Sequence, residues 1–185
     1  MIALLDTCVL FPRVLRDTLL DVAQAGMYDP RWSDRILEEL RRNLITHRGM
    51  DEDAAARLVV AMHEVFPEAA VDDYNVLIPA MTNHPKDRHV LAAAVRADAD
   101  LIVTSNLVDF PTTALVPFGI TAASPDDFLR LMYAQAPDDI VQVVMRQAAG
   151  YGRSPMTVAQ LVERLSNFAP DFAKELGTRL LEEVR

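Results

Sequence analysis

The chain has 185 residues, which is enough for one compact domain with a modest appendage. Hydrophobic residues make up 51% of it, yet no apolar run approaches the roughly 18 residues that span a membrane, so we expect a folded protein without a membrane partner. Cys8 is the only cysteine, which excludes an internal disulfide and a thiolate metal cage. The N-terminus lacks the pattern of a signal peptide, and we expect a cytoplasmic location.

The net charge of −9 argues at first against a nucleic-acid ligand, because phosphate binding usually leaves a basic surface. Its distribution along the chain weakens this objection. Five arginines and one histidine lie within residues 31–48, against three acids, and Arg13 and Arg16 precede this segment. A cluster of catalytic carboxylates would also add negative charge, which bound divalent cations would offset. The charge therefore excludes neither class of ligand.

The first two thirds of the chain predict strands that alternate with helices. Residues 2–5 form a short apolar run, typical of a buried strand, which ends at Asp6. Apolar spacing and capping residues predict helices over residues 14–25, 33–46, 51–65 and 87–97. Further strands are expected at residues 101–104 and, with weaker signals, at 69–71 and 119–121. This alternation predicts a three-layer α/β/α fold in which helices cover a parallel sheet.

The composition changes near residue 124, after which we expect only helices. They cover residues 125–136, 137–149, 157–167 and 170–184, and Pro137 and residues 150–155 separate them. We therefore predict two domains, with the sheet in residues 1–125 and an all-helical extension in residues 126–185.

Two acids are expected at one edge of the predicted sheet. Asp6 follows the first strand, and Asp109 lies in the segment that follows the strand at residues 101–104. Ligands gather beyond the carboxyl ends of parallel strands, so both acids are candidates for a binding site. Taken alone, each aspartate could instead start a turn or cap a helix.

Asp87 and Glu39 are candidates on predicted helices. Asp87 falls in a first helical turn on the buried face, which suits either the helix N-terminus or a metal site. Glu39 lies at the edge of an apolar stripe and shares a face with Asn43, and its alternative role is that of a solvated glutamate beside an arginine. Four acids that converge would favour divalent cations, because unpaired carboxylates packed together repel one another.

Four short motifs follow one another along the chain: LLDTCVLFP at residues 4–12, ILEELRRN at 36–43, PKDRHVLAAA at 85–94 and IVTSNLVDFP at 102–111. In sequence and in order they resemble the motifs of the PIN-domain family, and most closely those of its VapC-type toxins from toxin–antitoxin modules. The similarity covers about residues 1–130. The helical tail resembles the C-terminal extension of a subset of longer VapC-like proteins.

The resemblance implies that residues 1–125 form a PIN-like nuclease domain and assigns roles to individual side chains. It implies a catalytic set made of Asp6, Glu39, Asp87 and Asp109, of which Asp6, Asp87 and Asp109 would bind Mg²⁺ or Mn²⁺. It also implies orienting roles, toward ligands or water, for Thr104, Asn106 and Asn43. Many relatives have an acid in place of Asn106, so the number of metal ions is left open.

The implied activity is that of an endoribonuclease, in which a metal-activated water cleaves an RNA phosphodiester. The implied partner is a VapB-like antitoxin, and a homodimer is a further candidate assembly. The C-terminal helices could instead cover the active-site groove themselves. Contacts with the RNA backbone are expected from the basic segments, with four candidates: Arg13, Arg16, Arg41 and Arg42.

Two other functions are left open. A haloacid-dehalogenase-like phosphatase would use Asp6 as its nucleophile, but the second acid that it needs two residues later is Cys8 here. A degenerate PIN scaffold would bind RNA or protein without cleaving. The four histidines show no metal-ligand spacing, and we interpret each as a surface or structural residue.

Overall fold

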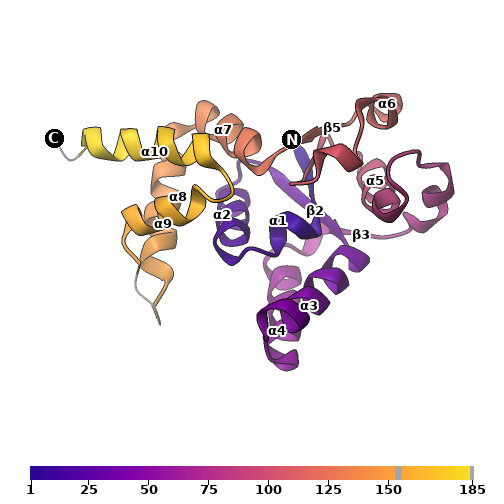
Figure 1. Cartoon of the computed structure of the whole chain (residues 1–185), viewed down its shortest axis with the longest axis horizontal. Helices are drawn as coiled ribbons and strands as arrows, with labels where there is room; N and C mark the ends of the chain where they lie inside the picture. Colours follow the sequence, from indigo (N-terminus) through magenta and orange to yellow (C-terminus); the bar gives the residue numbers. More distant parts are fainter. Residues whose placement is uncertain (153–155, 184–185) are drawn as a thin grey trace. The chain divides into compact units, whose positions relative to one another are not determined.

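The computed structural model describes residues 1–152 and 156–183, and the chain forms two compact units (Figure 1). The first unit contains residues 1–11 and 28–123, and the second contains residues 12–27 and the chain from residue 124 onward. This division differs from the predicted one, because residues 12–27 belong with the C-terminal helices. Within the described ranges, no helix is both long enough and apolar enough to cross a membrane.

The described part of the first unit is built on a five-stranded parallel sheet, with strand order β3-β2-β1-β4-β5. The strands are β1 (Ile2–Leu5), β2 (Asp29–Ser33), β3 (Ala70–Val71), β4 (Leu101–Val103) and β5 (Thr121–Ala123). The predicted α/β fold with a parallel sheet is therefore confirmed. The central strands are the most apolar ones, and the side chains of Ala3, Leu4 and Leu5 are fully buried.

Three helices of the first unit correspond to predicted ones: α3 (Asp34–Arg48), α4 (Glu52–Val65) and α5 (Arg88–Arg96). Two short helices, α1 (Thr7–Leu10) and α6 (Thr112–Leu115), were not predicted. Shorter 3-10 turns lie between them: η1 (Pro67–Ala69), η2 (Asn75–Ala80), η3 (Pro85–Asp87), η4 (Leu107–Asp109) and η5 (Val116–Phe118).

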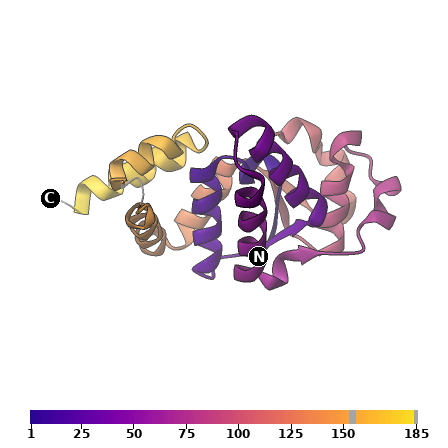
Figure 2. The same cartoon turned by 90° about the horizontal axis from the view of Figure 1, so that it is seen from below.

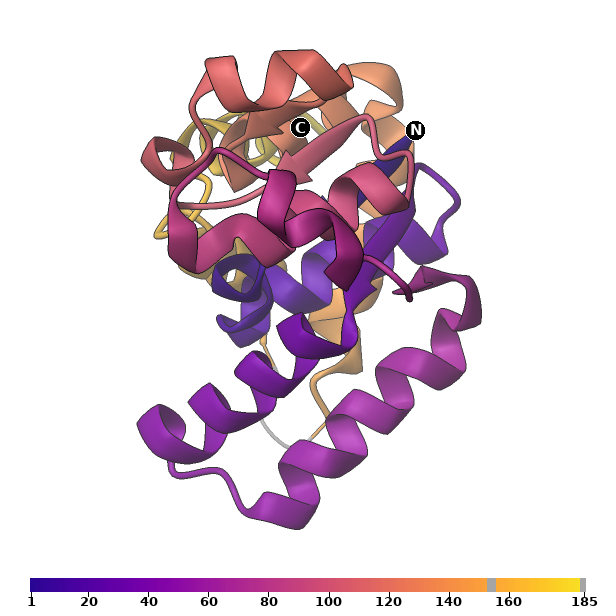
Figure 3. The ribbon, with the colours of Figure 1, turned by 90° about the vertical axis from the view of Figure 1, so that its right-hand side faces the viewer.

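The helices α3 and α4 form an antiparallel hairpin (Figure 3). Ser33 caps the start of α3 by accepting a hydrogen bond from Ile36 N, and Asp51 caps α4 in the same way through Ala54 N. Gly49 ends α3 with a φ of 61°, a left-handed conformation that costs glycine little. These caps fix where the helix that carries Glu39 begins and ends.

The sheet register brings the ends of β1 and β4 together. Leu5 pairs with Val103, and the next backbone N–H, that of Asp6, donates to Val103 O at 3.1 Å. Because the two strands are parallel neighbours, Asp6 and Thr104 emerge at the same edge of the sheet. This edge is where the candidate site lies.

Two strands differ from the prediction. The strand β2 was not predicted, because its sequence Asp-Pro-Arg-Trp-Ser lacks the apolar pattern of a strand and it is held by pairing with β1. The strand predicted at residues 119–121 instead covers Thr121–Ala123. Gly119 has a φ of 69° and forms the left-handed turn before that strand, so it cannot belong to it.

The second unit is helical throughout its described residues. Its helices are α2 (Arg13–Gln24), α7 (Pro125–Gln135), α8 (Pro137–Gly150), α9 (Val158–Leu165) and α10 (Pro170–Glu183). Figures 1 and 2 show α9 and α10 side by side near the end marked C. The predicted helix end at Val184 and residues 153–155 of the predicted separator lie outside the described residues.

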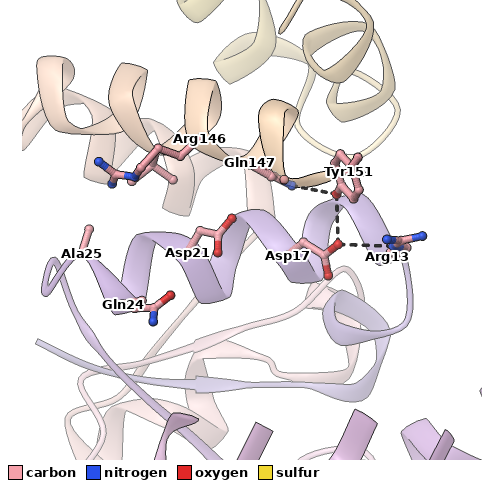
Figure 4. Close-up of a pocket in the computed structure, with 10 residues that line it drawn as sticks. Arg13, Asp17, Asp21, Gln24, Ala25, Arg146, Gln147 and Tyr151 are labelled. Atoms are coloured by element: carbon pink, nitrogen blue, oxygen red, sulfur yellow. Dashed lines mark hydrogen bonds and ion pairs between the residues drawn. The ribbon is translucent and has the colours of Figure 1, made fainter. Parts of the chain in front are cut away.

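Polar side chains join α2 to α8 within the second unit (Figure 4). Thr18 Oγ1 donates to Gln147 Oε1 at 2.8 Å, and Gln147 Nε2 donates to the hydroxyl of Tyr151 at 3.1 Å. That hydroxyl in turn donates to Asp17 Oδ2 at 3.0 Å. Arg13 lies over the ring of Tyr151, 4.9 Å from its centroid. The chain of contacts explains why α2 belongs to this unit.

A cleft of about 510 Å³ lies between α2 and α8 and contains Asp21. Burial, and to a smaller extent the charge of Asp17, raises the pKa of Asp21 to about 6 against the opposing charge of Arg146. In Figure 4 the carboxyl group of Asp21 points toward α8. Folding therefore makes ionisation of this side chain less favourable than it is in the unfolded chain.

Replacement of Asp21 by Asn tests whether the charge of this partly buried side chain destabilises the folded protein. The folded pKa of about 6 exceeds the ordinary value of 3.8, so the stability that the protonated group contributes is complete below pH 3.8 and is lost as the pH rises through 6. We expect Asp21→Asn to be more stable than the wild type at pH 7.5, by on the order of 1 kcal/mol after allowance for solvent screening.

Urea denaturation at pH 7.5 and pH 4 measures the effect, and the difference should shrink at pH 4. Asp72→Asn, at an exposed position in the first unit, is the matched control. Equal stability of Asp21→Asn and wild type at pH 7.5 would show that the pKa of Asp21 is not raised in the folded protein.

Candidate metal site at the carboxyl edge of the sheet

Asp6 is held at the sheet edge by two side-chain donors. Its Oδ2 accepts a hydrogen bond from Thr104 Oγ1 at 2.7 Å and another from Cys8 Sγ at 3.0 Å. Asp6 is 6% exposed and Thr104 is fully buried, so these donors replace water that the carboxylate would otherwise bind. Both donors engage the same oxygen, and no described residue donates to Oδ1. That second oxygen is thus left for a ligand.

Cys8 supplies one of these donors because its thiol stays protonated. Burial and, to a smaller extent, the negative charge of Asp6 together raise the pKa of Cys8 to about 12. The sulfur also accepts a hydrogen bond from the backbone N–H of Ser105 at 3.2 Å. Cys8 therefore connects the ends of β1 and β4, and its place in the structure is that of a neutral donor.

Asp87 and Asp109 lie together at this edge with a histidine that we had not predicted. Ligand atoms of His84, Asp87 and Asp109 all lie within 4.8 Å of one another, a spacing that could hold a metal ion. Asp87 ends the turn η3, and Asp109 ends the turn η4. The interpretation of His84 as a surface or structural residue was therefore incomplete, because its imidazole faces two carboxylates.

The electrostatics of Asp87 link it to the other acids. Burial first, and then the charges of Asp6 and Asp109, raise its pKa to about 6 against the opposing charge of Lys86. Asp87 is 7% exposed, and its Oδ2 accepts no hydrogen bond from the described residues. A buried, unpartnered carboxylate oxygen beside two further acids is an unfavourable arrangement unless a proton or a cation neutralises it.

Glu39 belongs to a neighbouring network. Its Oε1 lies 3.4 Å from His89 Nε2 and 3.4 Å from Arg35 Nε, and its Oε2 accepts a bond of 3.4 Å from Thr7 Oγ1. His89 is 2% exposed, and burial lowers its pKa, so the ring favours its neutral form although the charges of Glu39 and Asp6 oppose the shift. His89 thus lies within electrostatic reach of both Glu39 and Asp6, while Glu39 lies outside the ligand cluster of His84.

The predicted orienting residues have different surroundings. Thr104 contacts Asp6 directly, as described above. The backbone N–H of Asn106 donates to Thr104 Oγ1 at 3.1 Å, while its side chain is exposed. Asn43 is half-buried on α3, one turn after Glu39. Of these residues, Thr104 has the contacts that an orienting role requires.

The four arginines predicted to bind RNA also differ. Arg16 is 4% exposed, and its Nη2 lies 3.5 Å from Oδ1 of Asp17. Its guanidinium is therefore not available at the surface. Arg41 forms ion pairs with Glu38 at 2.9 Å and Glu52 at 3.1 Å, which tie α3 to α4. Arg13 is engaged with Asp17 and with the Tyr151 ring, as described above.

Arg42 is exposed, and no described residue forms an ion pair with it. It lies three residues after Glu39 on α3, and Arg35 lies four residues before Glu39, so the two arginines flank this acid on one helix face. Sequence reasoning missed His84, whose signal was its position three residues before Asp87 ahead of a proline turn.

The side chains present fit a divalent cation. The cluster offers two carboxylates and one imidazole, and Oδ2 of Asp87 accepts no hydrogen bond from the described residues, so it can take a cation as a ligand. Asp6 and Asp87 interact strongly enough to shift a pKa, which brings the predicted metal-binding acids Asp6, Asp87 and Asp109 into one electrostatic group. These residues would hold the ion.

Fold and side chains together define an α/β protein with an acidic site at the carboxyl edge of a parallel sheet, where the spacing of the ligand atoms could hold a metal ion. Residues 3–107, more than half of the chain, match the family described as "PIN domain". The chain therefore belongs to the PIN-domain family. Residues 125–178 match the family described as "VapC50 C-terminal domain", which covers most of the extension predicted at residues 126–185.

One curated relative is the "Putative ribonuclease VapC50" of Mycobacterium tuberculosis (strain ATCC 25618 / H37Rv). It is 46% identical over 100 residues, which make up 54% of this chain. The chain spans about 59% of the length of that relative. No solved structure matches the chain.

Replacement of Thr104 by Val tests whether its hydroxyl holds Asp6. The change keeps the shape of the side chain but removes a buried donor to a carboxylate, which should lower the free energy of unfolding by about 1.5–3 kcal/mol. Urea denaturation in the presence of a chelator measures this. Thr104→Ser keeps the hydroxyl and is the control; if both variants lose the same stability, the hydrogen bond to Asp6 is not the cause.

Proposed function

We propose that this protein is an endoribonuclease that depends on a divalent cation, Mg²⁺ or Mn²⁺. The observation that carries the proposal is the grouping of Asp87 and Asp109 with the electrostatically coupled Asp6 at the carboxyl edge of the sheet. Membership of the PIN-domain family and similarity to the mycobacterial protein named as a putative ribonuclease support ribonuclease activity. The phosphatase alternative loses its support, because the position of its second acid is occupied by the protonated thiol of Cys8.

A bound divalent cation would supply Lewis-acid polarisation of the phosphate and a nucleophilic water at neutral pH. Asp6, Asp87 and Asp109 would hold it. Thr104 and Cys8 keep Oδ2 of Asp6 hydrogen-bonded and so orient the free oxygen toward the site. Glu39, whose position is maintained by Thr7 and His89, would complete the catalytic set through direct or water-mediated contact with substrate.

Replacement of Asp6 by Asn tests the activity. Loss of this charged ligand should reduce cleavage of total bacterial RNA by about 100-fold or more, because transition-state charge would be poorly neutralised. Chelation of divalent cations should abolish cleavage by the wild type, and added Mn²⁺ should restore it.

The control is Asp72→Asn, which removes an exposed aspartate that is not part of the ligand cluster. Full cleavage by Asp6→Asn, or cleavage that survives chelation, would overturn the proposed mechanism. If the wild type binds the metal and RNA but does not cleave, the protein is the degenerate PIN scaffold.

We further propose that Arg42, together with Arg35, contacts the phosphates of RNA. Both lie on the face of α3 that carries Glu39, and Arg42 is exposed. Arg41 is assigned a structural role instead, because its guanidinium already pairs with Glu38 and Glu52. Arg16 is dropped from the predicted RNA-binding set because it is buried.

Single substitutions separate the two kinds of arginine. Arg42→Ala should weaken RNA binding and reduce the slope of log K against log salt by about 1, as expected for one lost phosphate contact. Arg41→Ala should leave that slope unchanged. Fluorescence anisotropy with a catalytically inactive background, across a salt series, measures both slopes; equal slopes for all three proteins would exclude Arg42.

A VapB-like antitoxin is proposed as the partner, in keeping with the VapC-type resemblance. An acid-lined site attracts arginine or lysine side chains, which gain strength when water is excluded. In the RNA assay above, an equimolar antitoxin should suppress cleavage, and a candidate that neither binds nor suppresses it is excluded. A cytoplasmic location and a homodimer stay predictions from the sequence.

A further inference from the structure

We propose that His84 is a nitrogen ligand of the metal centre, which would make this centre prefer first-row transition cations, beginning with Mn²⁺, over Mg²⁺. The inference rests on the proposed cation site for its role in cleavage. It goes beyond that proposal because it adds an uncharged ligand, outside the acidic set, that decides which ion is bound.

The first observation is the distance between His84 and Asp87. The Nδ1 atom of His84 lies 3.6 Å from Oδ2 of Asp87, too far for a good hydrogen bond. Two atoms that each lie about 2.1 Å from one ion can be separated by at most about 4.2 Å. The observed pair therefore has the spacing of two ligands of a shared ion. The full set with Asp109, within 4.8 Å, needs only a small closure.

The second observation is that the backbone fixes the same three residues to one another. The N–H of His84 donates to the carbonyl oxygen of Asp109 at 3.2 Å. The N–H of Asp87 donates to the carbonyl oxygen of His84 at 2.9 Å. These bonds join the turns η3 and η4, so the imidazole and both carboxylates are held near one another before any ion binds.

The third observation is independent of the clustering of acids. Asp87 is more than nine-tenths buried, and its Oδ2, the atom that faces His84 Nδ1, accepts no hydrogen bond from the described residues. A buried carboxylate oxygen without a partner is costly. The side chain of His84 is 52% exposed, so the site opens to solvent on the histidine side and a hydrated ion can reach it.

The donor set determines the class of ion. Mg²⁺ binds oxygen ligands and retains several waters, whereas an imidazole nitrogen favours the transition series. Mn²⁺ stands at the weak end of the Irving–Williams order, so a preference for Mn²⁺ over Mg²⁺ is the most demanding probe of a nitrogen ligand. The alternative is an ordinary contact between the imidazole and Asp87, with no metal bond.

The experiment compares the full-length wild type with His84→Ala, using MnCl₂ and MgCl₂ as probes. Calorimetry should show the wild type binding Mn²⁺ about 10-fold or more tightly than Mg²⁺. His84→Ala should lose about 10-fold in Mn²⁺ affinity and change its Mg²⁺ affinity by less than about twofold. Because His84 is exposed, the variant should keep its fold, which circular dichroism and urea denaturation verify.

Electron spin-echo spectroscopy of bound Mn²⁺ gives a readout that does not depend on cleavage. The wild type should show coupling to ¹⁴N, and His84→Ala should lose it. His63→Ala, a histidine on α4, is the matched control and should retain the coupling. Absence of ¹⁴N coupling in the wild type, or its persistence in His84→Ala, would overturn the inference.

The test also separates this inference from the nuclease proposal. If the wild type binds Mn²⁺ with ¹⁴N coupling but cleaves no RNA, His84 is a metal ligand and the proposed nuclease activity is wrong. If the wild type cleaves RNA with Mn²⁺ but shows no ¹⁴N coupling, the nuclease activity stands and His84 is not a metal ligand.

Discussion

Mutual repulsion between carboxylates is the constraint on which the rest of the candidate site depends. Asp6, Asp87 and Asp109 carry like charges at one edge of the sheet, and two of them are nearly buried. Water cannot screen charges in such positions as it does at the surface. Three features reduce the repulsion: neutral groups donate hydrogen bonds to Asp6, the pKa of Asp87 is raised, and the ligand atoms are spaced so that a cation fits between them.

The same constraint explains the uncharged residues around the acids. Thr104 and Cys8 each give a hydrogen bond to Asp6 without adding charge. His89, neutral because it is buried, contacts Glu39 in the same way. A lysine or arginine in any of these places would neutralise the carboxylate internally and reduce its value to a metal ion. The carboxylates of Asp6 and Glu39 therefore keep their negative charge while accepting hydrogen bonds from neutral groups.

Local sequence patterns predicted the parts of the fold that depend on local physics. The buried strand before Asp6 and the capped helix that carries Glu39 each have a pattern within a few residues. The strand β2 has no such pattern, because its conformation comes from hydrogen bonds with β1. For the same reason, local patterns did not place His84 in the site. Its backbone N–H bonds to Asp109, 25 positions later in the chain, and no short motif indicates that hydrogen bond. The proximity of Asp6 and Thr104 could be predicted from the sequence, because neighbouring parallel strands end at the same edge of a sheet.

The position of α2 in the chain has a consequence for biosynthesis. This helix is made early, but Thr18 must wait for Gln147, which lies 129 residues later, before its hydrogen bond can form. The buried side chains Leu15, Leu19 and Val22 likewise belong to a unit whose other helices all come after residue 124. A nascent or truncated chain that stops after the sheet therefore contains α2 but none of the helices that complete its unit, and the folding of this unit must await synthesis of the C-terminal helices.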